Sequence, residues 1–270
     1  MSRKYPKIVD QSGFLAKILI VDEIGLPVDD LVSELLVKGY LVYISTRNDT
    51  INELLPQNHN LYTISPKEIN SLSLIDYLVI IPHPGNASVT NLSGYPSSYK
   101  TIVFHQWPKD NNVSIKSDPM VQDVYYEDIV DQQVTNKIDQ LIQLRKEGTG
   151  LDLEREGSYH PLNPRTVGKA IDYIINHPFT GHSWWLTAGE YSWPLLIERV
   201  NNCTKVKITK KVNLDIPTPQ IPLNIPPLTF TADMDAFLVN RLSLPPAQIK
   251  PAYTIKTQDH NRIVNHVFTW

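Results

Sequence analysis

The sequence predicts an α/β fold built on a doubly wound parallel sheet. Two observations lead to this prediction. Continuous apolar runs suit strands that are buried on both faces, and these runs alternate with helical patterns. Lys17–Asp22 and Ile75–Ile81 are the clearest such runs. The chain has 270 residues, of which 41% are hydrophobic, so it is long enough to bury a large core.

A strand–helix–strand unit begins the pattern. Lys17–Asp22 is the first strand, and Leu31 and Leu35 then repeat at helical spacing. Gly39 ends this helix, because glycine adopts the left-handed conformation that follows many helices without strain. Leu41–Ser45 is the second strand. The whole unit spans roughly 30 residues, the usual length of a parallel crossover.

The same reasoning assigns the rest of the first two thirds of the chain. The predicted elements are a helical turn at Ile51–Leu55, strands at Leu61–Ile64, Ile75–Ile81 and Thr101–Phe104, helices at Val121–Lys146 and Pro164–Asn176, and a strand at Trp184–Leu186.

The composition changes after about Tyr191. Nine of the 21 prolines lie between Pro194 and Pro251, and proline removes the N–H donors that helices and central strands need. Cys203–Leu214 alternates polar and apolar residues, which predicts a half-exposed strand. We therefore predict two parts: a domain at residues 1–192 and a proline-rich extension at residues 193–270 that packs on this domain or on a partner.

Charge and composition exclude several classes of function. The net charge is −3 and no long basic block occurs, so we expect no nucleic-acid partner. No apolar run approaches the roughly 18 residues of a membrane span, and the first residues do not form a signal peptide. Cys203 is the single cysteine, which fits a reduced, cytoplasmic setting. The histidines lack partners at metal-ligand spacing, so no metal site is predicted.

Several segments between Lys17 and Gly189 resemble the short-chain dehydrogenase/reductase family. Lys38–Val42 with Thr46–Asn48 resembles the family's helix end, second strand and cofactor-selecting turn. Asn163–Val167 and Pro178–His182 resemble its late pattern before the last strand. The resemblance implies a Rossmann-like fold, an NAD(P) cofactor and an oligomer of short-chain-dehydrogenase-type subunits.

The residues that bind the cofactor in that family are largely replaced. The loop after the first strand, Asp22–Asp30, keeps one glycine, Gly25, and holds four carboxylates. A diphosphate binds backbone N–H groups at a helix N-terminus, and negative charge there repels it. Gly25 and Arg47 are the candidate cofactor-binding residues, and the alternative is that both belong to a cofactor site that no longer binds its ligand. A surface arginine after a strand is the alternative for Arg47.

The family's catalytic residues are absent. A tyrosine with a lysine four residues later transfers the proton in that family. None of the 13 tyrosines here has a lysine at that position, and His105 and Gln106 follow the strand where the catalytic serine would stand. His83 and His105 follow two central strands and are the candidate acid–base residues. Loop histidines with local hydrogen bonds are the alternative.

The leading hypothesis is therefore a degenerate member of the short-chain dehydrogenase fold that acts as a non-catalytic or regulatory subunit of a homo- or hetero-oligomer. In this hypothesis no cofactor is needed. The alternative is a cofactor-independent lyase, isomerase or cyclase of small-molecule biosynthesis that reuses the pocket, with His83 and His105 as acid and base and a small molecule as ligand. A third hypothesis is an NAD(P)-dependent oxidoreductase with an atypical site.

Overall fold

The computed structural model describes residues 14–47, 60–72, 74–83, 95–96, 98–107, 120–129, 137–153, 157–177, 183–214 and 225–230. The helical turn expected at Ile51–Leu55 lies outside these residues.

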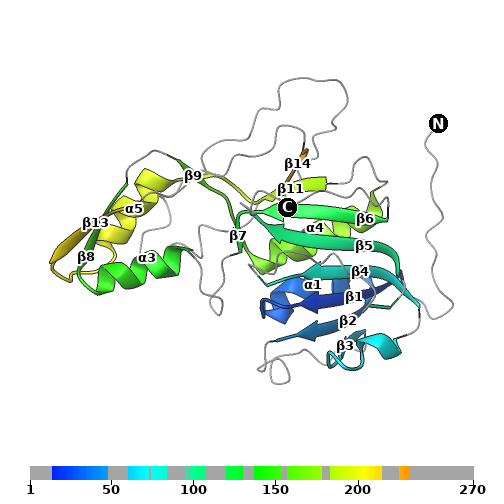
Figure 1. Ribbon diagram of the computed structural model, residues 1–270. Coiled ribbons are helices and arrows are strands. Elements are labelled where there is room, and N and C mark those ends of the chain that lie inside the picture. The colour runs from blue at the N-terminus through cyan, green and yellow to red at the C-terminus, as the bar shows by residue number, and fades with distance from the viewer. Residues whose placement is uncertain are drawn as a thin grey trace, which may run out of the picture. The chain divides into compact units, whose positions relative to one another are not determined.

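An eight-stranded sheet, with strand order β14-β11-β6-β5-β4-β1-β2-β3, is the largest feature of the fold (Figure 1). Its strands are β1 (Lys17–Asp22), β2 (Leu41–Thr46), β3 (Leu61–Thr63), β4 (Ile75–Ile81), β5 (Ser98–Gln106), β6 (Val121–Tyr126), β11 (Ser183–Thr187) and β14 (Pro227–Thr229). The order reverses after β1, since β2 and β3 lie on one side of it and β4 and β5 on the other. The predicted doubly wound α/β fold is confirmed.

The central strands are parallel and aligned at their carboxyl ends. Asp22 pairs with Thr46 across β1 and β2 and with Ile81 across β1 and β4. β4 and β5 are also parallel, with Ile80 opposite Val103. These ends therefore meet at one edge of the sheet, where open α/β sheets bind ligands.

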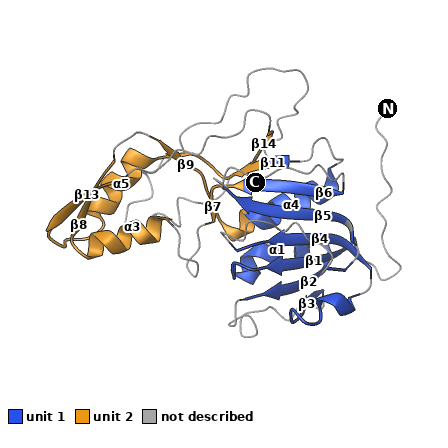
Figure 2. Cartoon of the chain, viewed as in Figure 1, with its two compact units in different colours: residues 1–125, 167–184 blue, residues 126–166, 185–270 orange. Residues whose placement is uncertain are grey.

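The chain divides into two compact units, shown in different colours in Figure 2. Unit 1 comprises residues 1–125 and 167–184, and unit 2 comprises residues 126–166 and 185–270. The domain boundary predicted at residue 192 stays a prediction, and the two compact units divide at other points.

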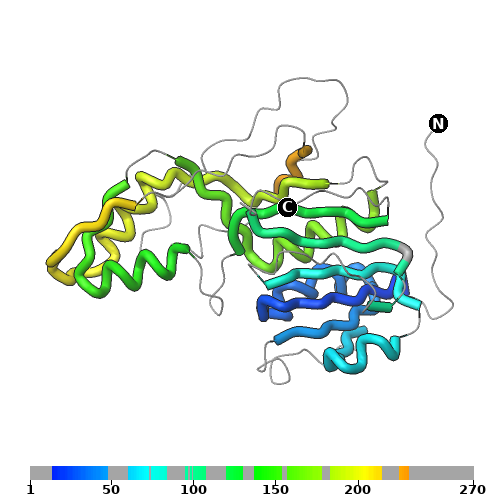
Figure 3. Tube along the Cα trace, in the orientation of Figure 1, coloured from blue at the N-terminus to red at the C-terminus, as the bar shows by residue number. Residues whose placement is uncertain are grey.

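In unit 1, helices α1 (Val28–Lys38) and α4 (Pro164–Asn176) lie side by side (Figure 3). Gly168 permits the contact, because a Cβ at this position would stand 2.2 Å from the carbonyl oxygen of Leu31. The Tyr40 hydroxyl donates to Asp172 Oδ1 at 3.0 Å and accepts from Asn176 Nδ2 at 2.7 Å. Gly168 and these hydrogen bonds thus hold α1 and Tyr40 against α4, which comes more than 120 residues later in the sequence.

Unit 1 also has the short 3-10 helix η1 (Ile69–Ser71), and unit 2 holds the other described elements. They are β7 (Asp128–Ile129), α3 (Lys137–Lys146), β8 (Thr149–Leu153), β9 (Ser158–Tyr159), β10 (Pro161–Leu162), β12 (Tyr191–Ser192), α5 (Trp193–Asn202) and β13 (Lys210–Leu214). The strands form three two-stranded sheets, β10-β7, β12-β9 and β13-β8.

The single long helix predicted at Val121–Lys146 is wrong. The structure forms β6, β7 and then the shorter helix α3 over this stretch. Gln122, Val124 and Tyr126 are buried at alternate positions of β6, which is the period of a strand. The helical repeat of apolar residues holds only for α3, where Ile138, Leu141 and Ile142 are buried.

The C-terminal region is described only in part. The strand predicted at Cys203–Leu214 forms over its last residues as β13. Residues 225–230 include β14, which pairs with β11 at the edge of the large sheet, a place where proline is tolerated. Most of the proline-rich extension lies outside the described residues. Within the described residues, none of the helices has the length and apolar character of a membrane span.

Candidate functional site

The loop that follows β1 is organised by the side chain of Asp22. This carboxylate is 1% exposed. Its Oδ1 accepts the N–H groups of Ile24 at 3.0 Å and Gly25 at 3.1 Å. Its Oδ2 accepts the N–H of Leu26 at 2.7 Å and the hydroxyl of Thr46 at 3.0 Å. Four donors therefore converge on one carboxylate at the carboxyl end of the first strand.

These contacts bear directly on a phosphate at this position. Backbone N–H groups ahead of a helix are what a phosphate binds in a Rossmann-type loop. Here the three N–H groups of residues 24–26 already point to Asp22. Burial raises the pKa of Asp22 above its ordinary value, although the hydrogen bonds from the loop oppose that shift. The residues present therefore do not fit a dinucleotide diphosphate in its usual pose.

The two predicted cofactor-binding residues lie at this edge. Gly25 has φ 86°, a left-handed conformation that favours glycine, and its N–H is one of the Asp22 donors. Arg47 follows β2, where its N–H donates to the Asp22 carbonyl oxygen at 3.3 Å and its side chain is exposed. The assignment of either residue to cofactor binding stays a prediction.

The structure places the two predicted acid–base histidines in different surroundings. His83 is exposed after β4, and its backbone N–H donates to Glu23 Oε2 at 3.2 Å. His105 belongs to β5, and its Nε2 lies 2.7 Å from Asp123 Oδ1 on β6. The side chains of His105 and Asp123 are 11% and 16% exposed, so this pair is largely shielded from water and still reachable.

Aromatic rings surround the His105–Asp123 pair. The His105 ring stacks on Tyr125 with centroids 5.2 Å apart, and Trp107 meets the same tyrosine edge-on at 5.8 Å. Burial, and then the nearby Asp123 carboxylate, raises the pKa of Tyr125 to about 12. At neutral pH this tyrosine is a neutral phenol, and His105 is oriented by a carboxylate in the way that acid–base histidines are.

Sequence reasoning missed Asp123. It fell inside the segment predicted as a helix, so it was not placed beside His105. The available signal was the run Val124, Tyr125 and Tyr126, since β-branched and aromatic residues favour strands. That strand places Asp123 and Tyr125 on the face opposite to Gln122, which accepts the indole N–H of Trp184 at 2.9 Å.

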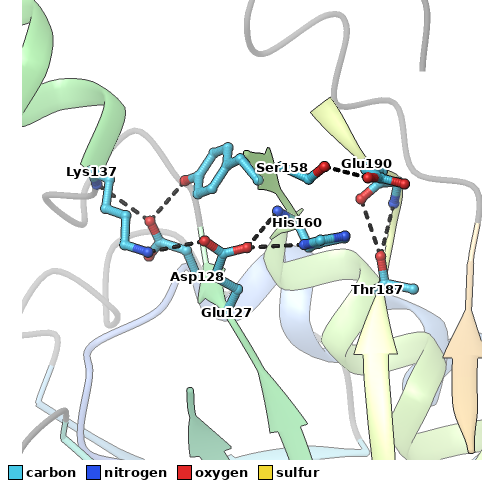
Figure 4. Close-up of polar contacts among 9 residues, drawn as sticks. Glu127, Asp128, Lys137, Ser158, His160, Thr187 and Glu190 are labelled. Atoms are coloured by element: carbon cyan, nitrogen blue, oxygen red, sulfur yellow. Dashed lines mark hydrogen bonds and ion pairs between the residues drawn. The ribbon is translucent and has the colours of Figure 1, made fainter. Parts of the chain in front are cut away.

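A second polar network lies in unit 2 and is drawn in Figure 4. Glu127 is fully buried, and its Oε1 accepts from Lys137 Nζ at 3.0 Å. Its Oε2 accepts the backbone N–H of His160 at 2.7 Å and lies 3.1 Å from His160 Nδ1. Asp128 Oδ2 accepts the Tyr159 hydroxyl at 2.7 Å and the Lys137 backbone N–H at 3.3 Å.

This network links β7, β9 and the first turn of α3, and it includes His160 between β9 and β10. Burial raises the pKa of Asp128, and burial followed by the Asp128 carboxylate raises that of Tyr159 well above its ordinary value. Tyr159 also packs on the Trp193 ring, with centroids 4.6 Å apart. Because the buried carboxylates of Glu127 and Asp128 have polar partners inside the chain, we interpret the network as structural.

The other aromatic residues near the end of β11 are internal. Trp185 is 0% exposed and Trp193 is 1% exposed. In the turn after β11, the Gly189 N–H donates to Thr187 Oγ1 at 3.3 Å. The Ser158 hydroxyl donates to the Glu190 carboxylate in the same region. Among the described residues, no cluster of three or more His, Cys, Asp or Glu could hold a metal ion.

Comparison with known proteins gives a likeness at the level of structure. The sequence matches no protein-family model and no curated protein. An epimerase from Methanothermobacter thermautotrophicus shares 10% identity at a TM-score of 0.50, covering 89% of this chain and 88% of its own. The likeness shows the fold.

Two further solved structures agree with it. A Bordetella bronchiseptica enzyme, WbmH, solved in complex with NAD+, shares 12% identity at a TM-score of 0.52, covering 77% of this chain and 89% of its own. The protein Pen from Bacillus thuringiensis shares 13% identity at a TM-score of 0.52, covering 76% and 80%. This chain thus has a Rossmann-like α/β fold similar to that of these proteins.

Proposed function

We propose that this chain has lost the dinucleotide-dependent redox chemistry of the short-chain dehydrogenase fold and acts as a non-catalytic subunit of an oligomer. The single observation that carries the proposal is the Asp22 carboxylate, which accepts the N–H groups of Ile24, Gly25 and Leu26. A phosphate in the same place would compete with the Asp22 carboxylate for these N–H groups and would be repelled by its negative charge.

The catalytic group adds independent support. No tyrosine of the sequence has a lysine four residues later, so the usual proton donor and the cation that tunes it are both missing. A chain without the phosphate loop and without the proton donor keeps only the scaffold of the fold. The function that we assign to this scaffold is association with other subunits.

Cofactor titration tests the loss of redox chemistry. The purified chain is titrated with NADH and NADPH while energy transfer from tryptophan to the nicotinamide is followed. We expect no saturation up to millimolar cofactor for the wild-type protein and for Asp22→Asn, which keeps the side-chain volume. Saturable binding in the micromolar range, or turnover of a carbonyl substrate by the isolated chain, would overturn the proposal.

The oligomer is tested separately. Light scattering coupled to size-exclusion chromatography measures the mass of the isolated chain, for which one copy is 30.8 kDa. A stable multiple of this mass supports association with itself. If the mass is that of a single copy, the proposal requires a partner subunit of a different kind. Co-purification from the native source should then yield that partner in a fixed ratio to this chain. A single-copy mass with no such companion would contradict the subunit assignment.

One observation favours a second candidate function. The 2.7 Å contact between His105 and Asp123, with Tyr125 stacked beside it, is an arrangement suited to proton transfer without a cofactor. In this alternative, His105 exchanges a proton with a small-molecule substrate and Asp123 fixes the orientation of its ring. A cofactor-free isomerase or lyase activity that falls at least about 100-fold in His105→Gln, and less in Asp123→Asn, would favour it over the subunit function.

A further inference from the structure

An exposed edge strand with a strong positive charge lies in unit 2. Residues 205–213, which include most of β13, are all exposed. Val206, Ile208 and Val212 expose about 40% of their surface each, at 41%, 41% and 39%. Val212 lies on β13 itself, and Val206 and Ile208 lie in the segment that leads into it. Large aliphatic side chains this accessible on and beside an edge strand need an explanation, because edge strands are the natural sites for pairing with another chain.

The strand is held firmly on its inner side. Lys210–Leu214 pairs in parallel with Thr149–Leu153 of β8 along its whole length. A Cβ at Gly150 would stand 2.9 Å from Ile208 Cγ2, so the missing side chain lets the aliphatic residue pack there. Just before the strand, the Thr209 N–H donates to the Gly148 carbonyl oxygen at 2.8 Å. A strand held in this way presents its outer edge in a fixed conformation, which lowers the entropy cost of docking.

The two edges of this small sheet differ. On β8, the Asn201 side chain donates to the Leu151 carbonyl oxygen at 2.7 Å and accepts the Leu151 N–H at 3.0 Å. Asn201 thereby satisfies the backbone where a neighbouring strand would pair. β13 and β8 form a two-stranded sheet, and no further strand of the described residues pairs with β13. Among the described strands, the edge of β13 is thus the one left for a partner strand.

The charge of the segment selects the partner. From Arg199 to Leu214 the sequence has five basic residues, namely Arg199, Lys205, Lys207, Lys210 and Lys211, and no acidic residue, although the whole chain carries −3. One of these lysines, Lys211, makes a long contact of 3.8 Å with exposed Asp152. Pairing of two copies along this edge would set lysines against lysines, which disfavours self-association, whereas an acidic strand is attracted.

We propose that β13 is a docking edge for an acidic, extended segment of a partner protein, which adds to the β13-β8 sheet as a third strand. Backbone hydrogen bonds give affinity in this mode, and alternate side chains give specificity. Acidic residues would meet the lysines, and apolar residues would cover Val206, Ile208 and Val212. Nucleic acid fits less well, because residues 199–214 contain no aromatic side chain on which bases could stack. The proposal does not depend on the loss of the cofactor site.

A peptide titration of the full chain tests the proposal. The probe is a fluorescein-labelled peptide of alternating Glu and Val, followed by fluorescence anisotropy at low salt. Three comparison probes are a Lys–Val peptide, single-stranded oligothymidine, and the Glu–Val peptide with N-methyl groups on alternate amides. The N-methylated peptide keeps the charge and cannot form the full strand ladder. We expect saturable binding of the Glu–Val peptide and at least about tenfold weaker binding of all three others.

A pair of variants with the same change in net charge localises the site. Lys207→Glu with Lys210→Glu reverses the charge beside β13, and we expect it to weaken Glu–Val peptide binding at least about tenfold. Lys38→Glu with Lys67→Glu changes two exposed lysines of unit 1 and should leave binding within about twofold. Circular dichroism and urea unfolding confirm that both variants fold. The N-methylated probe keeps the test valid if one of them does not.

Four results would overturn the proposal. They are no binding of the Glu–Val peptide at millimolar concentration, equal binding of its N-methylated form, tighter binding of oligothymidine, and equal loss of binding in both double variants. Self-association in sedimentation velocity that Lys207→Glu with Lys210→Glu abolishes would assign the edge to a second copy of this chain. That result would also contradict a separate acidic partner.

Discussion

Two aspartates of unit 1 stand beside groups that resemble parts of an active site, and the structure uses them differently. Asp22 is 1% exposed and accepts four hydrogen bonds, three of them from the loop where a diphosphate would bind. Asp123 has a side chain that is 16% exposed and pairs with a single histidine. The first carboxylate takes up the backbone N–H groups of its own loop, whereas the second contacts a histidine that is still partly exposed.

Under the proposed function, this difference is one way in which a fold can lose a cofactor and keep its stability. The N–H groups at the start of a Rossmann-type helix need an acceptor, since unpaired buried donors are costly. In proteins that bind a dinucleotide, phosphate oxygens supply the acceptors. Asp22 supplies them here from within the chain, so the loop is complete without a ligand. A ligand that took the place of the Asp22 carboxylate would have to displace four hydrogen bonds.

The largest expected effect comes from removing that internal acceptor. Asp22→Ala leaves three loop N–H groups and the Thr46 hydroxyl without their acceptor, and we expect it to lower the free energy of unfolding by roughly 3 to 5 kcal/mol. The measurement is urea unfolding followed by tryptophan fluorescence. Asp29→Ala, at an exposed position in the first turn of α1, is the control and should cost less than about 1 kcal/mol. Equal losses of unfolding free energy in the two variants would contradict the role of Asp22 as the acceptor that stabilises the loop.

Asp123 should matter less to stability. Asp123→Ala breaks one partly exposed contact with His105, and we expect a loss of about 1 to 2 kcal/mol in the same unfolding experiment. The comparison between the two aspartates fails if this loss equals or exceeds that of Asp22→Ala. His105→Gln should cost a similar amount, and the double variant should cost less than the sum of the two single variants because they share one interaction.

A smaller effect should appear at high pH through Tyr125. Its pKa in the folded protein is about 12, whereas an unperturbed tyrosine ionises near 10. The folded protein therefore resists losing this proton, and its stability should fall as the pH rises from 10 to 12. We expect the loss to be about 1 kcal/mol after allowance for solvent screening.

The variant Tyr125→Phe isolates the contribution of this tyrosine to the pH dependence of stability. The variant should lose less stability than the wild type between pH 10 and 12, measured by urea unfolding at a series of pH values. Absorbance at 295 nm should show one fewer tyrosine ionising late in the titration. Tyr62→Phe removes a tyrosine that is 49% exposed and serves as the matched control. An unchanged number of late-ionising tyrosines in Tyr125→Phe would contradict the assignment, since Tyr159 ionises late in both proteins.

The fold could be predicted from the sequence where local signals are strong. The strands predicted at Lys17–Asp22 and Ile75–Ile81 have those same bounds in the structure, because continuous apolar runs of this length have few alternatives in an α/β protein. The helix predicted at Pro164–Asn176 is also confirmed. The helix predicted from Val121 failed, since two short strands and a helix follow one another there and their apolar residues together imitate a helical repeat.

The candidate site was harder to predict, for a physical reason. The acidic residues of the first loop were visible in the sequence, and they were interpreted as charges that repel a phosphate. That one of them folds back onto Ile24, Gly25 and Leu26 depends on the loop conformation, which the sequence alone does not specify. His105 was selected from its place after a strand, whereas its partner Asp123 lies eighteen residues away on another strand, a separation set by tertiary pairing.

The central claim is that the Asp22 carboxylate occupies the N–H groups that a dinucleotide would need. The backbone amides of Ile24, Gly25 and Leu26 report on it directly in ¹H–¹⁵N correlation spectra of the labelled chain, recorded with and without millimolar NADPH. We predict that the three amide signals stay at the same positions when cofactor is added, and that all three move in Asp22→Asn without any cofactor. A saturable shift of these three signals with NADPH in the wild-type protein would contradict the account.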